Sequence, residues 1–319
     1  MILSQKKSII VILGPTAVGK TRMALELKES FPQIEVISAD SRQIFRLMNI
    51  GTAKPSPAEL SVLPHHFIDI KNPDENINAG EFGVAGRDMY RQLRKQQKIP
   101  IVVGGSGLYI RSLIDGLFQG RVSDPEVKSM LQQRADKEGL AGLFAEMMKI
   151  DPEAAPKIHP NDRQRIVRAL EVWRVTGQSV SQLRKKLHPK IDLTPVFIGL
   201  NREREKLYQI INARVGRMIT DGLIEEVQRM RMHGYNRKLQ SQKTVGYQEI
   251  HDYLDKNISL PEAVELIKRN TRRFAKRQLT WFNRDERITW FKIDDESGWR
   301  KAKEELTVAI EKYLADFVA

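Results

Sequence analysis

The sequence predicts an α/β protein: a parallel sheet with flanking helices, plus an inserted all-helical subdomain. Three observations support this fold class. Apolar runs at 9–13, 34–38 and 99–103 are typical of buried strands, and stretches with helical spacing separate them. Strands that alternate with helices favour a parallel sheet covered on both faces. Between 119 and 194 the pattern is helical only, and an apolar strand follows at 195–200.

The points where the strand pattern stops and resumes predict the domain boundaries. We expect one core domain made of residues 1–118 and 195–319, and a helical insertion at 119–194. A capping box with proline at the first helical position, Ser123–Glu126, opens the first helix of the insertion. A second capping box, Ser259–Glu262, opens a long helix in the carboxyl-terminal part.

A complete phosphate-binding motif follows the first strand. It fits the pattern G-x-x-x-x-G-K-[ST] between a buried strand and a helix, which is the context that the motif requires. Inward-facing backbone N–H groups and the helix N-terminus attract phosphate oxygens. Lys20 is placed to neutralise terminal phosphate oxygens, and the Thr21 hydroxyl is placed to bind Mg²⁺. The sequence therefore predicts a P-loop NTPase-like core with a di- or triphosphate site made of Gly14, Pro15, Thr16, Ala17, Val18, Gly19, Lys20 and Thr21.

Composition restricts the partners and the compartment. The chain has no cysteine, which excludes disulfides, Cys-based zinc sites and a thiol nucleophile, and suits a reducing cytoplasm. No apolar run is long enough to cross a bilayer, and the amino end lacks a signal-peptide pattern, so we expect a cytoplasmic protein. The 53 basic residues exceed the 40 acidic ones, and the net charge of +13 points to a polyanionic partner.

Two more polar features follow predicted strands. Asp40 follows the second strand, and its carboxylate can either bind a metal ion or accept a proton. Gly104 and Gly105, after the third strand, open a second glycine-rich turn that could admit a flat base or a second phosphate, although such glycines often serve packing alone. Since ligands of parallel sheets bind at the carboxyl ends of the strands, we expect the loop at Gly14, Asp40 and Gly104 on one edge.

Basic residues concentrate in two predicted helices. The carboxyl-terminal helix has no Asp or Glu between Lys268 and Arg284. Within it Lys268, Arg272 and Lys276 share one face, where like charges repel unless an anion is present. The insertion adds three more arginines: Arg163, Arg165 and Arg168. Charge runs are usually solvated faces, but two arginine-rich helices beside a phosphate site favour a nucleic-acid backbone.

Eight segments run along nearly the whole chain in the order of a known family: Gly14–Thr21, Asp40–Gln43, Gly51–Pro55, Pro64–Asp69, Gly104–Tyr109, His159–Asp162, Arg165–Glu171 and Arg277–Phe282. Together they resemble the tRNA dimethylallyltransferase family, the isopentenyltransferases that modify the adenosine following the anticodon. Phe45 stands where tyrosine is usual, Asn49 where aspartate is usual, and Ser106 where threonine is usual. The lack of cysteine, and hence of a carboxyl-terminal zinc finger, matches the bacterial form.

The resemblance implies a reaction. A dimethylallyl group moves from dimethylallyl diphosphate to N6 of the adenine at position 37, next to the anticodon, in tRNAs that read codons beginning with U. The loop at Gly14 holds the donor's diphosphate, which Lys20, Mg²⁺ on Thr21 and Arg214 stabilise as it leaves, with Arg217 as the second choice of arginine. Asp40 accepts an N6 proton, and a monomer suffices.

The resemblance also implies where the tRNA lies. The target adenosine is flipped out of its loop, as enzymes that act on bases generally require. Residues after the second strand read its edges, the insertion contacts the anticodon arm, and the carboxyl-terminal helix contacts its backbone. The expected tRNA-binding residues are Asp40, Ser41, Arg42, Gln43, Ser106, Asn161, Asp162, Arg163, Gln164, Arg165, Arg272, Lys276, Arg277, Gln278, Trp281 and Arg284.

Two alternative functions share the phosphate loop. A P-loop kinase for a small metabolite has no need for a charge of +13 or for two arginine-rich helices. An RNA-binding P-loop ATPase needs a water-positioning group in addition to a metal-binding acid, and no clear one stands out. A related enzyme that prenylates free adenine nucleotides would have no use for the helical insertion or the basic helix.

Overall fold

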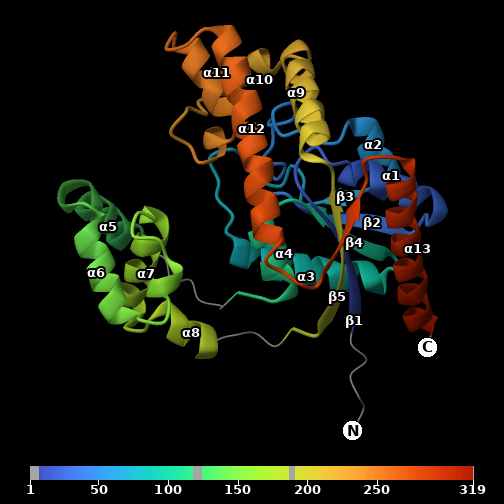
Figure 1. Cartoon of the computed structure of the whole chain (residues 1–319), viewed down its shortest axis with the longest axis horizontal. Helices are drawn as coiled ribbons and strands as arrows, with labels where there is room; N and C mark the ends of the chain where they lie inside the picture. The colour runs from blue at the N-terminus through green and yellow to red at the C-terminus, as the bar shows by residue number, and fades with distance from the viewer. Residues whose placement is uncertain (1–6, 118–123, 187–190, 319) are drawn as a thin grey trace. The chain divides into compact units, whose positions relative to one another are not determined.

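The computed structural model describes residues 7–117, 124–186 and 191–318, which divide into two compact units. The first, here called the core unit, comprises Met1–Ile114 and Asp192–Ala319. The second, the helical unit, comprises Asp115–Ile191. The helical segment is therefore an insertion into the chain of the core unit (Figure 1).

The core unit contains a six-stranded sheet in which all described strand pairs are parallel. The strand order is β3-β2-β4-β1-β5-β6 (Figure 1). The predicted α/β fold class with a P-loop-like parallel sheet is thus confirmed. The strands are β1 Lys7–Leu13, β2 Ile34–Ala39, β3 His65–His66, β4 Ile99–Gly104, β5 Leu193–Asn201 and β6 Ile288–Lys292.

Strand β1 lies inside the sheet and is apolar along its length. Residues 9–13 are at most 1 % exposed, which is expected of a parallel strand buried on both faces. Ile10 and Ile12 belong to a core cluster with α1 Lys20–Ser30 and α13 Glu296–Val318, so these helices cover one face of the sheet. Alternate residues of a strand point to the other face. That face is covered by α3 Ala79–Lys95 and α4 Gly107–Ile114.

Further helices lie past the carboxyl ends of the strands (Figure 1). The longest of them, α12, is capped by the Ser259 hydroxyl, which accepts a hydrogen bond from the Glu262 N–H. It ends at Phe282, as the predicted long helix requires, and packs against α4, α9 and α11. The helices of this region are α2 Pro57–Val62, α9 Arg204–Thr220, α10 Leu223–Met232, α11 Tyr247–Leu254 and α12 Leu260–Phe282, with a short 3₁₀ turn at Ser241–Lys243.

The helical unit has its own apolar core. Leu131, Leu143, Ile166 and Leu170 are completely buried in it. Its helices are α5 Pro125–Glu138, α6 Leu140–Ile150, α7 Arg163–Thr176 and α8 Val180–Lys186, with a 3₁₀ turn at Ala155–Lys157.

Two helices of the helical unit have carboxylate caps. Ser123, expected to cap α5, lies outside the described residues. The cap that the structure describes is Asp124, whose Oδ1 accepts the N–H groups of Glu126 and Val127. Asp162 caps α7. Among the described helices of both units, none is long and apolar enough to span a membrane.

Candidate active site

The phosphate loop lies at the carboxyl edge of the sheet, where β1 ends beside β4 and β5. Leu13 pairs with Gly104 and with Gly199. Gly14 has a φ of 148°, and a Cβ there would lie 2.3 Å from the Leu200 carbonyl oxygen, so only glycine allows the loop to turn at this point. Helix α1 begins at Lys20 with no side-chain cap, which leaves the N–H groups of its first turn available to an anion.

Lys20 points back onto its own loop. Its Nζ donates to the carbonyl oxygens of Gly14 and Pro15 at 3.1 and 2.9 Å. Burial lowers the pKa of Lys20 to about 8; the charge of Asp40 opposes this shift and that of Arg214 adds to it. The ammonium group therefore lies within electrostatic reach of both, in a site that favours entry of an anion.

Arg214 joins helix α9 to the phosphate loop. Its Nη2 donates to the Thr16 hydroxyl at 2.7 Å. Burial lowers the pKa of Arg214 to about 10, against the effect of Asp40, which raises it. Its Nε is buried and has no acceptor among the described residues, so this donor is available to a ligand. Arg217, one turn further along α9, is exposed, and no described contact joins it to the loop.

Asp40 follows β2 and forms a tight turn. Its Oδ1 accepts the backbone N–H groups of Arg42 and Gln43 at 2.8 and 3.2 Å. Within the described residues nothing donates to its Oδ2. Burial lowers the pKa values of Lys20, Arg42 and Arg214, and the charge of Asp40 opposes this lowering at each of them. One oxygen is thus fixed by the backbone while the other remains a free acceptor.

The residues after Asp40 are held by their neighbours. Ser106 Oγ accepts the Ser41 N–H at 2.9 Å, which joins the turns that follow β2 and β4. Arg42 donates to the carbonyl oxygen of Gln240 at 3.1 Å. Gln43 Nε2 donates to the carbonyl oxygens of Thr52 and Ala53, at 3.3 and 3.0 Å. Some polar groups of this segment are therefore already hydrogen-bonded to other residues of the core unit.

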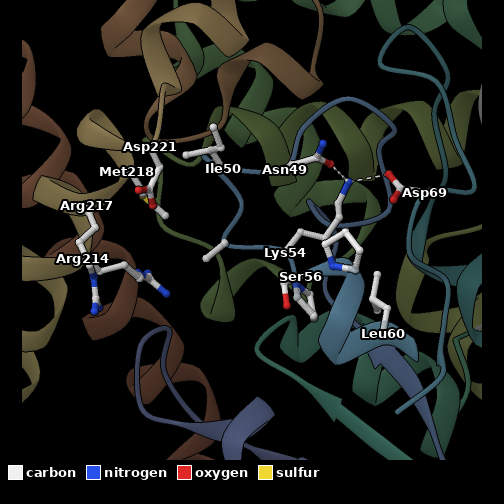
Figure 2. Close-up of a pocket in the computed structure, with 13 residues that line it drawn as sticks. Asn49, Ile50, Lys54, Ser56, Leu60, Asp69, Arg214, Arg217, Met218 and Asp221 are labelled. Atoms are coloured by element: carbon white, nitrogen blue, oxygen red, sulfur yellow. Dashed lines mark hydrogen bonds and ion pairs between the residues drawn. The ribbon is translucent and has the colours of Figure 1, made fainter. Parts of the chain in front are cut away.

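A cavity of about 400 Å³ adjoins Arg214. Figure 2 shows Arg214, Arg217, Met218 and Asp221 on one side of it and Asn49, Lys54, Leu60 and Asp69 on the other. The two sides come from α9 and the following turn, and from the 49–69 segment. The full lining is Asn49, Ile50, Ala53, Lys54, Pro55, Ser56, Pro57, Leu60, Asp69, Arg214, Arg217, Met218 and Asp221.

The cavity combines cations with apolar side chains. Lys54 Nζ donates to Asp69 at 2.6 Å and to Asn49 Oδ1 at 2.8 Å, as the dashed lines of Figure 2 mark. Burial lowers the pKa of Lys54, and the bond to Asp69 counteracts this. From the sequence, Gly51–Pro55 was only a segment matching the family, and neither Lys54 nor the cavity was given a role.

Helix α12 carries the expected basic surface. Lys276, Arg277 and Arg284 are exposed, and none of the three has an acidic partner among the described residues. Arg272 instead donates to Asn212 Oδ1 at 2.7 Å, with its guanidinium over the Tyr208 ring.

Two expected RNA-binding residues of α12 face inward. Trp281 packs against Gly107, where a Cβ would lie 2.2 Å from the indole. Gln278 is only 7 % exposed, and both ends of its amide bind backbone groups of the core unit. Gln278 thus lies on the buried stripe of the helix, and its expected contact with tRNA stays a prediction.

The expected RNA-binding residues of the helical unit lie near the start of α7. Asn161, Gln164 and Arg165 are exposed. Arg163 donates to Asp136 at 2.6 Å, and Arg165 lies 3.3 Å from Asp162. Exposed ion pairs of this kind are worth only about 0–1 kcal/mol, so they leave both guanidinium groups available to a stronger anion.

The described residues contain no group of three or more His, Cys, Asp or Glu side chains suited to a metal ion. Mg²⁺ at nucleotide sites needs fewer, because it keeps several waters and uses phosphate oxygens as ligands. A hydroxyl at Thr21 and one carboxylate at Asp40 are oxygen donors of the kind that Mg²⁺ prefers.

The fold and this site define a phosphate-binding α/β protein, in which an anion loop adjoins a partly apolar cavity and a carboxylate with a free oxygen. Residues 43–285 match the model of the family described as IPP transferase, and the chain belongs to this family. It is 45 % identical over 284 residues to a tRNA dimethylallyltransferase from Alkaliphilus oremlandii, covering 89 % of this chain and 90 % of that protein.

Solved structures agree with this assignment. The tRNA isopentenylpyrophosphate transferase from Bacillus halodurans is 37 % identical, with a TM-score of 0.71 over 97 % of this chain and 99 % of that one. A eukaryotic dimethylallyltransferase solved while acting on tRNA is 26 % identical, with a TM-score of 0.80 over 97 % and 80 % of the two chains.

Proposed function

We propose that this protein transfers a dimethylallyl group from dimethylallyl diphosphate to N6 of adenine 37 in tRNAs that read codons beginning with U. One observation carries the proposal: Leu13 and Ala39, which precede the phosphate loop and Asp40, both pair with Gly104, so the buried cations of the loop and a carboxylate with a free oxygen share one edge of the sheet. A leaving anion and a proton acceptor are the two groups that this alkyl transfer needs. Family membership supports the same reaction.

The phosphate loop and Arg214 receive the donor's diphosphate. Lys20 exchanges the two loop carbonyls for phosphate oxygens, and the unpartnered Nε of Arg214 supplies one more donor. Charge-assisted hydrogen bonds of this kind are roughly twice as strong as neutral ones. The five-carbon chain occupies the apolar part of the cavity, beside Ile50, Leu60 and Met218.

The Thr21 hydroxyl would hold a Mg²⁺ ion that accompanies the diphosphate, with Asp40 as the nearby carboxylate. The bound ion would neutralise charge on the leaving group. The protein's own cations, Lys20 and Arg214, share that task.

The reaction is a substitution at C1 of the allyl group. The bond from adenine N6 to C1 forms as the bond from C1 to the diphosphate oxygen breaks, and the electron pair leaves with the diphosphate. The N6 lone pair is delocalised into the ring, so the nitrogen is a weak nucleophile, and it loses a proton as its bond to C1 forms. Asp40 Oδ2 accepts that proton, a contribution worth about 10²–10⁴-fold in rate.

The tRNA binds through exposed cations. Lys276, Arg277 and Arg284 of α12 contact the backbone, and residues 161–165 of the helical unit contact the anticodon arm. The flipped adenine lies beside Ser41, Arg42, Gln43 and Ser106, whose remaining polar atoms read its edges. Since its substrate is tRNA, we place the enzyme in the cytoplasm, acting as a monomer.

The experiment incubates the protein with labelled dimethylallyl diphosphate, Mg²⁺ and unmodified tRNA, followed by nucleoside analysis. We expect labelled N6-dimethylallyladenosine and free diphosphate. Parallel incubations with labelled ATP test a kinase and an RNA-dependent ATPase. Cleavage of ATP with chemically unchanged purines would refute the proposal.

A further inference from the structure

Gln278 connects the two glycine-rich turns of the active site. It lies on the buried stripe of α12, and its Oε1 accepts the backbone N–H of Thr16 at 2.8 Å. Its Nε2 donates to the carbonyl oxygen of Gly105 at 2.9 Å. One side chain thus binds the phosphate loop with its acceptor and the turn after β4 with its donor.

The local geometry selects an amide at this position. A Cβ on Gly105 would lie 2.3 Å from Gln278 Nε2 and 3.4 Å from the Gly14 carbonyl oxygen, so the turn approaches this closely only as glycine. An amide offers one acceptor and one donor end, whereas a carboxylate only accepts and a thioether does neither well. A glutamate here would face a backbone carbonyl oxygen, and a methionine would leave the Thr16 N–H unpaired.

Thr16 links Gln278 to Arg214 by hydrogen bonds. Its N–H is bound by Gln278, and its hydroxyl accepts Nη2 of Arg214 at 2.7 Å. The same arginine has the unpartnered Nε and lines the cavity. The position of Arg214 therefore depends on Gln278 through one intermediate residue.

We propose that Gln278 is a positioning residue for the donor diphosphate, acting through Thr16 on Arg214. This inference rests on the proposed function, because it assigns the diphosphate to the phosphate loop. It assigns Gln278 to binding of the dimethylallyl diphosphate donor, in place of the RNA contact expected of its segment. A residue that fixes a charged group can matter greatly, since a misplacement of about 1 Å can cost about 10²-fold in rate.

The test compares two Gln278 variants with a control on the same helix. Gln278→Met keeps the length of the side chain without the amide, and Gln278→Glu keeps an acceptor without the donor. Thr280→Ala is the control, since Thr280 is exposed and its hydroxyl bonds only within α12. The measurements are kcat, KM for each substrate, the dissociation constant of inorganic pyrophosphate, and the melting temperature.

We expect both Gln278 variants to lower kcat and weaken pyrophosphate binding by about 10-fold or more, with KM for tRNA unchanged. Thr280→Ala should alter neither kcat nor pyrophosphate binding. Thr16→Val removes the hydroxyl that holds Arg214, so combining it with Gln278→Met should cost little more than either change alone.

Two results would overturn the inference. The first is weaker tRNA binding with unchanged pyrophosphate affinity in Gln278→Met, which would make Gln278 an RNA contact. The second is full additivity of the Thr16 and Gln278 changes. Failure of the proposed function is recognised separately, because the unmodified protein would then form no prenylated nucleoside at all.

Discussion

The Tyr247 hydroxyl donates a hydrogen bond to Glu226 Oε1 at 2.6 Å, and this pair supports the wall of the cavity. Glu226 is 3 % exposed, and its carboxylate also accepts the backbone N–H groups of Asn49, Ile50 and Gly51. The Tyr247 ring leaves no room for a Cβ on Gly51, which would lie 2.4 Å away. Burial and the neighbouring carboxylate raise the pKa of Tyr247 far above its usual value, so the phenol keeps its proton.

Glu226→Gln should destabilise the protein and weaken donor binding. The amide has one acceptor oxygen, so at least one of the three backbone N–H groups loses its partner, at a cost of about 1–3 kcal/mol. We expect lower stability in urea unfolding and a higher KM for dimethylallyl diphosphate, with KM for tRNA unchanged. Tyr247→Phe is the matched variant, since it removes only the hydroxyl and keeps the ring that packs on Gly51. An unchanged donor KM in both variants would contradict the link between this pair and the cavity.

Pyrophosphate binding should take up a proton near pH 8. The buried Lys20 has a pKa of about 8, lowered from 10.5, so in the free protein it is partly neutral at this pH. An anion on the loop stabilises the ammonium form, and affinity should therefore fall as the pH rises above 8. Calorimetry in two buffers with different ionisation enthalpies measures the proton uptake. Lys20→Arg keeps its charge throughout and should abolish the uptake; equal uptake in this variant would assign the proton to another group.

The same lysine affects stability in a defined direction. Between about pH 8 and 10.5 the unfolded chain binds a proton that native Lys20 has lost. The contribution of Lys20 to the free energy of unfolding therefore rises with pH in this window. Lys20→Met should remove that contribution, and urea unfolding at pH 8 and pH 10 compares the two proteins.

Asp40→Asn should nearly abolish prenyl transfer while tRNA affinity stays close to normal. An asparagine Oδ1 still accepts the N–H groups of Arg42 and Gln43, so the turn survives while the proton acceptor is lost. We expect a loss of about 10²–10⁴-fold in single-turnover rate. Asp40→Ala also releases the turn and should be at least as inactive. Full activity of the asparagine variant would remove Asp40 from the chemistry.

Sequence patterns predicted the fold best where burial was continuous. The apolar runs of β1, β2, β4 and β5 were recognisable as strands in the sequence, since each is buried on both faces over several residues. The sequence did not reveal the two edge strands, because β3 has only the two residues His65–His66 and β6 is half-exposed. Short or half-exposed strands carry too few apolar residues for a pattern to emerge.

The candidate site was predicted less completely, because its contacts join distant segments. Thr16 and Arg214 are 198 positions apart, and no local pattern links them. A usable signal did exist for Gln278 and Glu226. Each lies on the buried stripe of its helix, Gln278 with Ala275 and Phe282, and a polar residue on such a stripe needs a partner in the core.

Thr21→Ala should weaken the Mg²⁺-dependent use of the diphosphate donor. The hydroxyl is the protein ligand that we assign to the ion, so its loss should raise the Mg²⁺ concentration needed for half-maximal rate. Thr21→Ser keeps the hydroxyl and should behave like the unmodified protein. The measurement is a magnesium titration at saturating tRNA; identical curves for the alanine and serine variants would count against Thr21 as the metal ligand.

Removing three cations from α12 should flatten the salt dependence of tRNA binding. Lys276, Arg277 and Arg284 are exposed and lack acidic partners among the described residues, whereas Arg272 is held by Asn212 and fits this test less well. Each phosphate contact contributes roughly 0.7–0.9 to the slope of log K against log salt, so the triple alanine variant should lose about two units of slope.

The control for that experiment removes the same formal charge from other helices. Lys95 on α3 and Arg300 and Lys301 on α13 are exposed, and their triple alanine variant lowers the net charge equally. A general electrostatic attraction would affect both variants alike, whereas direct contact affects only the α12 variant. Equal slopes for the two variants would show that the α12 cations act through net charge and that this helix face does not touch the RNA backbone.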